Sequence, residues 1–214
     1  MSSLAKSLEE FDEEAVLSRV RTDLRHGRPA VEIIEDLRDG MTAVGTRFQN
    51  GEYFLNGLIM SAEIFRTALK LLDSRTSRAS QHSALGKIVI GTVEGDIHDI
   101  GKNIVTTFLK SAGFDVYDLG VDVSPEKFVR EIKRTGATIL GLSCLLTSGF
   151  EPMQATIKKL EEAGLRKRVK VMIGGAAGAV VTRDWVKRLS ADAFAKDCVE
   201  GIQLAKAFAR VSKK

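Results

Sequence analysis

The chain has 214 residues, of which 44% are hydrophobic and 28% are charged, and its formal net charge is +4. Such values are typical of globular proteins with one or two domains. A membrane-spanning helix needs about 18 apolar residues in succession, and no apolar run in the sequence approaches this length. The N-terminus, MSSLAKSLEEFDEE, becomes acidic where a signal peptide would be apolar. Two cysteines cannot provide a disulfide framework for a chain of this length. We therefore expect a soluble, cytoplasmic protein that does not associate with membranes.

The basic net charge does not indicate a nucleic-acid-binding protein. Basic residues alternate with acidic ones along most of the chain instead of forming a basic stripe. The densest basic run, Arg166 to Lys170, follows an expected helix end at Gly164, where positive charge complements the helix dipole. We therefore expect no nucleic-acid partner.

The first 72 residues show only helical periodicity. Apolar residues recur at steps of three and four, which is the spacing of a buried helical stripe. The three stripes are Phe11, Ala15, Val20 and Leu24, then Val31, Ile34, Leu37, Met41, Val44 and Phe48, and then Leu55, Leu58, Ala62, Phe65, Leu69 and Leu72. If the second stripe breaks near Gly40, residues 1–72 form an antiparallel bundle of about four helices.

A polar segment follows this helical domain. Residues 73–84, DSRTSRASQHSA, are rich in serine and show no periodicity. We expect a linker here, followed by a second domain of residues 85–214. His82 lies in this segment and is predicted to be an exposed linker residue.

From Lys87 onward the pattern becomes an alternation of strands and helices. Short continuous apolar runs predict strands that are covered on both faces. The expected strands are residues 87–93, 115–119, 138–144, 169–175 and 192–196, and the expected helices are 101–112, one that begins at Ser124 and Pro125, 152–163, 182–190 and 198–210. This order predicts a Rossmann-like (flavodoxin-like) α/β domain, a doubly wound parallel five-stranded sheet that binds ligands at the carboxyl ends of its strands.

The loop after the first expected strand contains the best candidate for a metal ligand. His98 follows Asp96 by two residues and directly precedes Asp99. An aspartate that holds the second nitrogen of a histidine is common at metal sites. Zinc is a poor fit because no second His or Cys stands at ligand spacing, whereas one histidine is sufficient for a metal that a macrocycle already holds. The simpler alternative is a loop histidine that caps the next helix.

Three segments of the second half resemble one protein family. Residues 91–105, GTVEGDIHDIGKNIV, are similar to the cobalamin-binding domain of the methionine synthase and corrinoid methyl-carrier family. Ser143-Cys144-Leu145 and Gly174-Gly175, at the ends of two later strands, are similar to the same family. Because several motifs stand in the expected structural contexts, they support one another.

The helical half resembles the same family, so the resemblance covers nearly the whole chain. Gly40-Met41, Gly45, Phe48 and residues 51–55, GEYFL, are similar to the helical cap that precedes the cobalamin domain. The resemblance implies that Phe48 and Leu55 cover the methyl-bearing face of the cofactor, where an apolar cover excludes water. Both also fall on helical stripes, so a plain core role is the alternative.

The resemblance also implies how the cofactor, a cobalamin, is bound. The cofactor's own base leaves the cobalt and its tail enters the Rossmann-like domain. His98 then becomes the lower axial metal ligand, and Asp96 hydrogen-bonds the other ring nitrogen. Asp99, Ile100 and Gly101 would lie beside the cofactor, and Gly101 would leave room for the tail near a helix N-terminus.

The ends of the later strands complete the implied site. Ser143 would donate a hydrogen bond to the base of the tail, and Gly174 and Gly175 would leave space for it on the opposite wall. Thr147 is expected to contact the cofactor. Leu145 would either pack against the cofactor or belong to the core.

One position departs from the family pattern. Some members place a hydroxyl residue at the position of Gly149, where it completes a series of hydrogen-bonded side chains that runs from the histidine through the aspartate to the hydroxyl group. Thr147, Ser148 or a water molecule would have to reach Asp96 instead. Cys144 is expected to be an unreactive cysteine in a buried strand.

The implied function is methyl transfer through the cobalt of the cofactor, which supplies the chemistry. No second catalytic constellation is present in the sequence, so we expect a non-catalytic corrinoid subunit of a multi-component methyltransferase system. The expected partners are a substrate:corrinoid methyltransferase, a corrinoid:acceptor methyltransferase that passes the methyl group to tetrahydrofolate or a thiol, and a reductive activator. Methoxylated aromatics, methylamines, methanol and betaines are all possible donors, with O-demethylase and methylamine systems preferred.

Two other classes of cobalamin-dependent protein are less consistent with the sequence. A cobalamin-dependent sensor has a similar helical cap, but it would normally carry a DNA-binding segment, and no helix-turn-helix pattern with a basic reading helix is present. An adenosylcobalamin mutase subunit would present the upper face of the cofactor directly to a barrel, and the helical cap argues against this.

Overall fold

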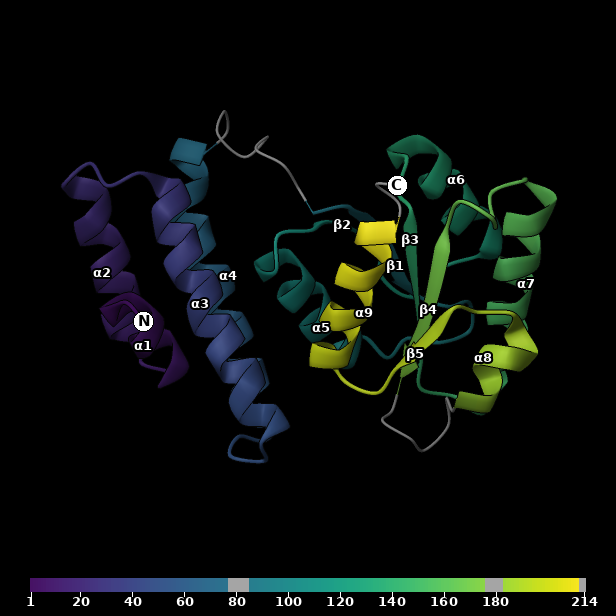
Figure 1. The fold of residues 1–214 in the computed structure, drawn as a ribbon, viewed down its shortest axis with the longest axis horizontal. Coiled ribbons are helices and arrows are strands. Elements are labelled where there is room, and N and C mark those ends of the chain that lie inside the picture. The colour runs from purple at the N-terminus through teal and green to yellow at the C-terminus, as the bar shows by residue number, and fades with distance from the viewer. Residues whose placement is uncertain (77–84, 176–182, 212–214) are drawn as a thin grey trace. The chain divides into compact units, whose positions relative to one another are not determined.

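The structure is a computed structural model that describes residues 1–76, 85–175 and 183–211, with the side chains of residues 1–72, 85–175 and 184–210. The chain divides into two compact units, Met1–Ser83 and Ala84–Lys214, and each is described by itself (Figure 1). In the part of the chain that the structure describes, no helix has the length and apolar character needed to cross a bilayer.

The first unit consists of the helices α1 (Ser3–Glu9), α2 (Glu13–Arg25), α3 (Ala30–Gln49) and α4 (Leu55–Thr76). The side chains of Ser2 and Asp12 cap α1 and α2 by accepting hydrogen bonds from the backbone N–H groups of Ala5 and Ala15. Helix α4 continues past Leu72 into the segment that was expected to be a linker. His82 lies outside the described residues.

The breaks between the first helices differ from the prediction. Gly40 was expected to break the second stripe, but α3 passes through it without interruption. The additional break lies instead at Phe11, at the start of the first stripe and between α1 and α2, where a φ of 61° cannot belong to a right-handed helix. A Cβ atom at Gly40 would lie 2.8 Å from the carbonyl oxygen of Ala5. The glycine therefore allows α1 to approach α3 closely and does not end a helix.

The second unit contains the strands β1 (Lys87–Thr92), β2 (Asp115–Asp118), β3 (Ile139–Cys144), β4 (Lys170–Gly175) and β5 (Ala193–Ala195). They form one parallel sheet in the order β2-β1-β3-β4-β5. This is the strand order of the flavodoxin-like doubly wound fold, so the predicted architecture is confirmed.

Helices cover both faces of this sheet. Helices α5 (Ile100–Ser111) and α9 (Cys198–Val211) lie on one face, and α6 (Pro125–Thr135), α7 (Phe150–Glu162) and α8 (Arg183–Leu189) lie on the other (Figure 1). The predicted start of α6 is confirmed, with Ser124 at the N-cap position and Pro125 as the first helical residue. A short 3-10 turn, Thr147–Gly149, precedes α7.

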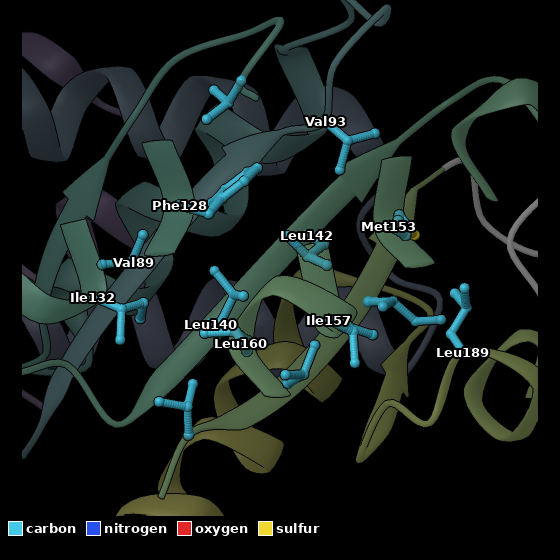
Figure 2. Packing of buried hydrophobic residues seen from close by; sticks show 14 of the residues in the cluster. Val89, Val93, Phe128, Ile132, Leu140, Leu142, Met153, Ile157, Leu160 and Leu189 are labelled. Atoms are coloured by element: carbon cyan, nitrogen blue, oxygen red, sulfur yellow. The ribbon is translucent and has the colours of Figure 1, made fainter. Parts of the chain in front are cut away.

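Successive residues of the central strands point to opposite faces, so each strand contributes to two cores. Val89 and Leu140 belong to the larger core, together with residues of α6 and α7 such as Phe128 and Ile157 (Figure 2). Their neighbours in the strands, such as Ile88 and Ile139, pack with residues of α5 and α9 on the other face. Burial on both faces explains why these strands read as continuous apolar runs.

The topology positions a binding site at one edge of the sheet. The chain leaves β1 through α5 toward β2, and leaves β3 through α7 toward β4, so the loops after β1 and β3 diverge to opposite faces. In a doubly wound sheet, such a switch point opens a crevice at the carboxyl ends of the two strands. The loop that contains Asp96 and His98 lies at this point.

Candidate functional site

The loop after β1 is held in place by hydrogen bonds at both of its ends. The Thr92 hydroxyl donates to the carbonyl oxygen of His98 at 3.0 Å. The N–H of Gly95 donates to Oδ1 of Asp122 at 2.8 Å, and the N–H of Asp122 donates to the carbonyl oxygen of Asp96 at 3.0 Å. Asp122 has a φ of 51°, an uncommon conformation for a residue with a side chain, and such strain is often found at functional sites.

Asp96 is completely buried, and its carboxylate is the centre of the site. Oδ1 accepts a hydrogen bond of 2.9 Å from the backbone N–H of His98, and Oδ2 accepts one of 2.6 Å from the N–H of Leu145. Burial alone would raise the pKa of Asp96, but hydrogen bonds from these two N–H groups and from the Cys144 and His98 side chains outweigh burial and lower the pKa to about 2. Asp96 is therefore ionised at neutral pH.

The His98 ring is oriented by this carboxylate. Its Nδ1 lies 2.6 Å from Oδ1 of Asp96, and an ionised carboxylate can only accept a hydrogen bond. Nδ1 must therefore carry the proton, so that Nε2 of the neutral ring carries the lone pair. Among the described residues the structure gives Nε2 no partner, and the side chain is 49% exposed. This is the arrangement of a histidine prepared to bind a metal through Nε2.

The metal must bring its other ligands with it. Within residues 1–76, 85–175 and 183–211, no group of three or more His, Cys, Asp or Glu side chains is placed to hold an ion. Large apolar side chains are exposed on the His98 loop and after β2 and β3 instead: Ile97 is 74% exposed and Ile100 is 66% exposed, with Val121, Leu145 and Leu146 also exposed. Exposed apolar side chains on the same loop as one free ring nitrogen fit the flat, mostly apolar face of a metal macrocycle.

The first turn of α5, beside the loop, leaves room for a further part of a ligand. In the sheet register, Ser143 lies between Thr92 and Gly174, and Cys144 lies beside Gly175. A Cβ atom at Gly101 would have no neighbour within 4 Å. Packing therefore does not explain this glycine, whereas a ligand that passes over the first turn of α5 would. The residues present thus fit a cobalamin with its nucleotide tail.

The remaining predicted site residues lie on three different segments of the chain. Asp99 precedes α5, and its Oδ2 accepts a hydrogen bond of 2.9 Å from the Asn103 side chain. Thr147 is exposed in the 3-10 turn. Phe48 is half-buried and Leu55 is 56% exposed, but both belong to the first unit, so the structure does not relate them to His98.

Two residues outside the predicted site residues have clear structural roles. Cys144 is buried, and its thiol donates a hydrogen bond of 3.2 Å to the carbonyl oxygen of Leu146. Lys102 is buried in α5, and its Nζ lies 2.7 and 2.8 Å from the two carboxylate oxygens of Asp118 at the end of β2. Lys102 was given no role in the sequence analysis, and the signal that could have found it is a charged residue among the apolar positions of a helix.

Comparisons with known proteins match both units of the chain to cobalamin-binding domains. Two family models, both described as "B12 binding domain", match residues 86–200 and residues 2–73. Dimethylamine corrinoid protein 2 from Methanosarcina mazei is 40% identical over 96% of this chain and 95% of its own length.

Two solved structures are also similar. A cobalamin-binding protein from Desulfitobacterium hafniense is 36% identical, with a TM-score of 0.75 over 96% of this chain and 97% of that chain. The methanol:cobalamin methyltransferase complex MtaBC from Methanosarcina barkeri contains a chain that is 27% identical, with a TM-score of 0.83 over 97% of this chain and 78% of that one.

These matches span nearly the whole chain and define its class, a cobalamin-binding protein with a helical N-terminal unit and a Rossmann-like domain. The chain belongs to the family of corrinoid proteins. The predicted cofactor is thereby confirmed as a cobalamin or related corrinoid.

Proposed function

We propose that this protein is the methyl carrier of a methyltransferase system and that His98 is the lower axial ligand of its cobalt. The observation that carries the proposal is the His98 ring, whose Nδ1 is held by Asp96 and whose Nε2 is directed to no described protein group. When bound, the corrinoid supplies a cobalt centre that can accept and release a methyl group. The protein binds and orients the cofactor, fixes the tautomer of its ligand, and keeps water away.

We infer that the nucleotide tail lies along the ends of β1, β3 and β4. Ser143 would donate a hydrogen bond to the base, and Gly101, Gly174 and Gly175 would provide the space. The open surface at Gly101 supports this position, since nothing in the protein fills it. Leu145 is exposed and not part of the core, which favours its contact with the cofactor.

The first unit is proposed to cover the methyl-bearing face of the cofactor. The start of α4 and the residue before it present four exposed apolar side chains, Phe54, Leu55, Ile59 and Met60. Such a patch is unusual on a surface that always faces water. With Phe48, it would exclude water from the methyl group and would have to move aside when a methyltransferase docks.

We propose a methylated amine as the methyl donor. The support is the 40% identity to a dimethylamine corrinoid protein over nearly both complete chains. Methanol is the next candidate because of the similarity to a chain of the methanol:cobalamin methyltransferase complex.

Three further features of the system stay predictions: a methoxylated aromatic donor, as in O-demethylase systems, a tetrahydrofolate or thiol acceptor, and a reductive activator. A cytoplasmic location also stays a prediction, and the two buried free thiols are compatible with it.

The proposal is tested by loading the protein with hydroxocobalamin. We expect one cofactor per chain, with an absorption spectrum of a histidine-ligated cobalamin, and we expect His98→Ala to bind the cofactor without this ligand. The same spectrum for both proteins would contradict the assignment of His98. Methylation of the loaded protein by a dimethylamine-specific, a methanol-specific or a methoxyaromatic-specific methyltransferase then identifies the donor. Failure with all three would contradict the proposed role as a carrier for these donors.

A further inference from the structure

We propose that Tyr53 is a positioning residue of the first unit, because its side chain ties the turn between α3 and α4 to the end of α1 and so fixes Phe54 and Leu55, the two residues that follow it. This inference deepens the proposed function and rests on the proposed role of the first unit as a cover of the cofactor. The contacts that carry it all lie within that unit.

The turn between α3 and α4 is closed by its own backbone. Gly51 has a φ of 76°, in the left-handed region that favours glycine. The N–H of Glu52 donates to the carbonyl oxygen of Arg47 at 2.9 Å, and the N–H of Gly57 donates to that of Phe54 at 3.0 Å. Bonds of this kind shape the turn but do not attach it to the other helices.

The Tyr53 side chain provides this attachment. Its hydroxyl donates a hydrogen bond of 3.0 Å to the carbonyl oxygen of Glu9, the last residue of α1, which is 44 positions away in the chain. Carbonyl groups in the last turn of a helix have no acceptor role within the helix, so this one is free to accept. Tyr53 is half-buried, whereas Phe54 and Leu55 are exposed. The anchored side chain thus directly precedes the two exposed apolar ones.

Arg47 joins the same cluster at the end of α3. Its Nε lies 2.6 Å from Oε1 of the buried Glu9 side chain. Its guanidinium group also donates a hydrogen bond of 3.4 Å to the Tyr53 hydroxyl and lies 5.2 Å from the centroid of the tyrosine ring. The hydroxyl therefore accepts from Arg47 and donates to Glu9, which a tyrosine can do and a phenylalanine cannot.

Phe11 packs beside the tyrosine ring. The two ring centroids are 4.8 Å apart, with the ring planes inclined by 47°. Phe11 has a φ of 61°, which is an unfavourable conformation for an aromatic residue. A Cβ atom at Gly57, in the first turn of α4, would lie 2.9 Å from the Phe11 ring, closer than carbon atoms pack. A strained residue and a glycine inside a helix, both unfavourable by themselves, thus allow this ring to lie against Tyr53.

A firmly held turn suits a cover of the cofactor. An apolar side chain excludes water from a bound methyl group only while it stays in place. The side chains of Phe54 and Leu55 are exposed, so the anchor of the turn has to lie at a neighbouring residue. Because Tyr53 orders the turn within the first unit, the entropy of ordering does not oppose each closure of the cover.

The first test uses the protein without cofactor. Hydrogen exchange of the backbone amides of Glu52 and Gly57 reports how often the turn opens. We expect Tyr53→Phe to speed this exchange about fivefold, which is the effect of one ordinary hydrogen bond. Tyr117→Phe removes the hydroxyl of the other tyrosine of the chain, in β2, and should leave both amides unchanged. Wild-type exchange in Tyr53→Phe would overturn the proposal.

A second variant tests whether Arg47 and Tyr53 act together. Arg47→Lys keeps a positive charge beside Glu9 but removes the planar group that contacts the tyrosine. We expect faster exchange at the same two amides. In combination with Tyr53→Phe, the effect should be smaller than the product of the two single effects, since the residues share one network. Effects that multiply would overturn the proposed cluster.

The last test uses the full chain loaded with hydroxocobalamin. The rate at which azide replaces the water ligand on the upper face of the cobalt measures access to that face and is read from the absorption spectrum. We expect Tyr53→Phe to raise this rate about fivefold, by the same loss of one hydrogen bond, and Tyr117→Phe to leave it unchanged. Leu55→Ala, which removes part of the proposed cover, should also raise it.

The two proposals fail in different ways in this last test. If Leu55→Ala exchanges azide at the wild-type rate, the first unit does not cover the cofactor and its proposed role is wrong. If Leu55→Ala raises the rate but Tyr53→Phe does not, only the role of Tyr53 is wrong.

Discussion

The backbone N–H of Leu145 donates a hydrogen bond of 2.6 Å to Oδ2 of Asp96, although the two residues are 49 positions apart in the chain. This bond joins the end of β3 to the loop after β1. The other carboxylate oxygen of Asp96 faces His98 at 2.6 Å. The orientation of the ligand ring therefore depends on both strands at the switch point of the sheet.

Asp96→Asn is expected to destabilise the protein without cofactor by about 2 kcal/mol at pH 7. Both oxygens of Asp96 accept backbone hydrogen bonds, from the N–H groups of His98 and Leu145. The NH₂ group of an asparagine side chain would face one of these two N–H groups, so that two donors would meet without an acceptor. Chemical denaturation of both proteins measures this difference. Asp99→Asn, an exposed carboxylate in the same loop, is the control and should cost less than about 0.5 kcal/mol.

The stability difference between the wild type and Asp96→Asn is expected to depend on pH. The pKa of Asp96 is lowered to about 2 in the folded protein, and the ordinary value in an unfolded chain is about 3.9. Its contribution to stability is therefore fully present above about pH 4 and is lost as the pH falls toward 2. The stability difference between wild type and Asp96→Asn should shrink in this range, and a constant difference would contradict the assignment of the pKa.

Lys102→Met is expected to destabilise the protein by about 2 kcal/mol, because it leaves the Asp118 carboxylate without its buried partner. Nζ of Lys102 contacts both oxygens of Asp118 and also lies 2.7 Å from Oδ1 of Asn103. Lys110→Met changes an exposed lysine of the same helix and is the matched control. Equal unfolding midpoints of the two variants in urea would show that the buried ion pair is not important for stability.

Gly101→Ala should separate folding from cofactor binding. A Cβ atom at this position meets no protein atom within 4 Å, and alanine is the better helix former. The melting temperature should therefore stay the same or rise slightly. Cobalamin affinity, measured by calorimetry, should fall at least about tenfold if the tail passes over the first turn of α5. An unchanged affinity would place the tail elsewhere.

Residues 85–214 alone are expected to bind cobalamin, and residues 1–72 alone are not. Both cores of the sheet are built from residues of the second half, and Asp96, His98 and the strand ends all lie there. Absorption spectra after gel filtration of each fragment with hydroxocobalamin would show which one retains the cofactor. Retention by the helical fragment would contradict the proposed site.

The second unit could be predicted well from local patterns. Every predicted strand ends within one residue of the observed strand, because strands buried on both faces appear as short apolar runs between polar turns. The start of α6 at Ser124 and Pro125 was predictable for a similar reason, since helix starts have their own residue preferences.

The helical unit shows where local patterns are insufficient. Glycine at position 40 suggested a break, yet it lies in the middle of α3 and faces the backbone of Ala5. The actual break is at Phe11, which carries an apolar side chain and gives no turn signal. Whether a glycine ends a helix or allows another helix to approach depends on the neighbouring helix, and this neighbour is known only from the packing.

The sequence by itself determined that Asp96 and His98 can pair, because two residues in one loop at this spacing can bring a carboxylate within reach of a ring nitrogen. The donors on the far side of that carboxylate were decided only by the tertiary structure. Thr147, Ser148 or a water molecule was the expected donor, whereas the structure places the backbone N–H of Leu145 2.6 Å from Oδ2 of Asp96. The parallel pairing of β1 with β3 brings this N–H group to Asp96, because the two strands end side by side.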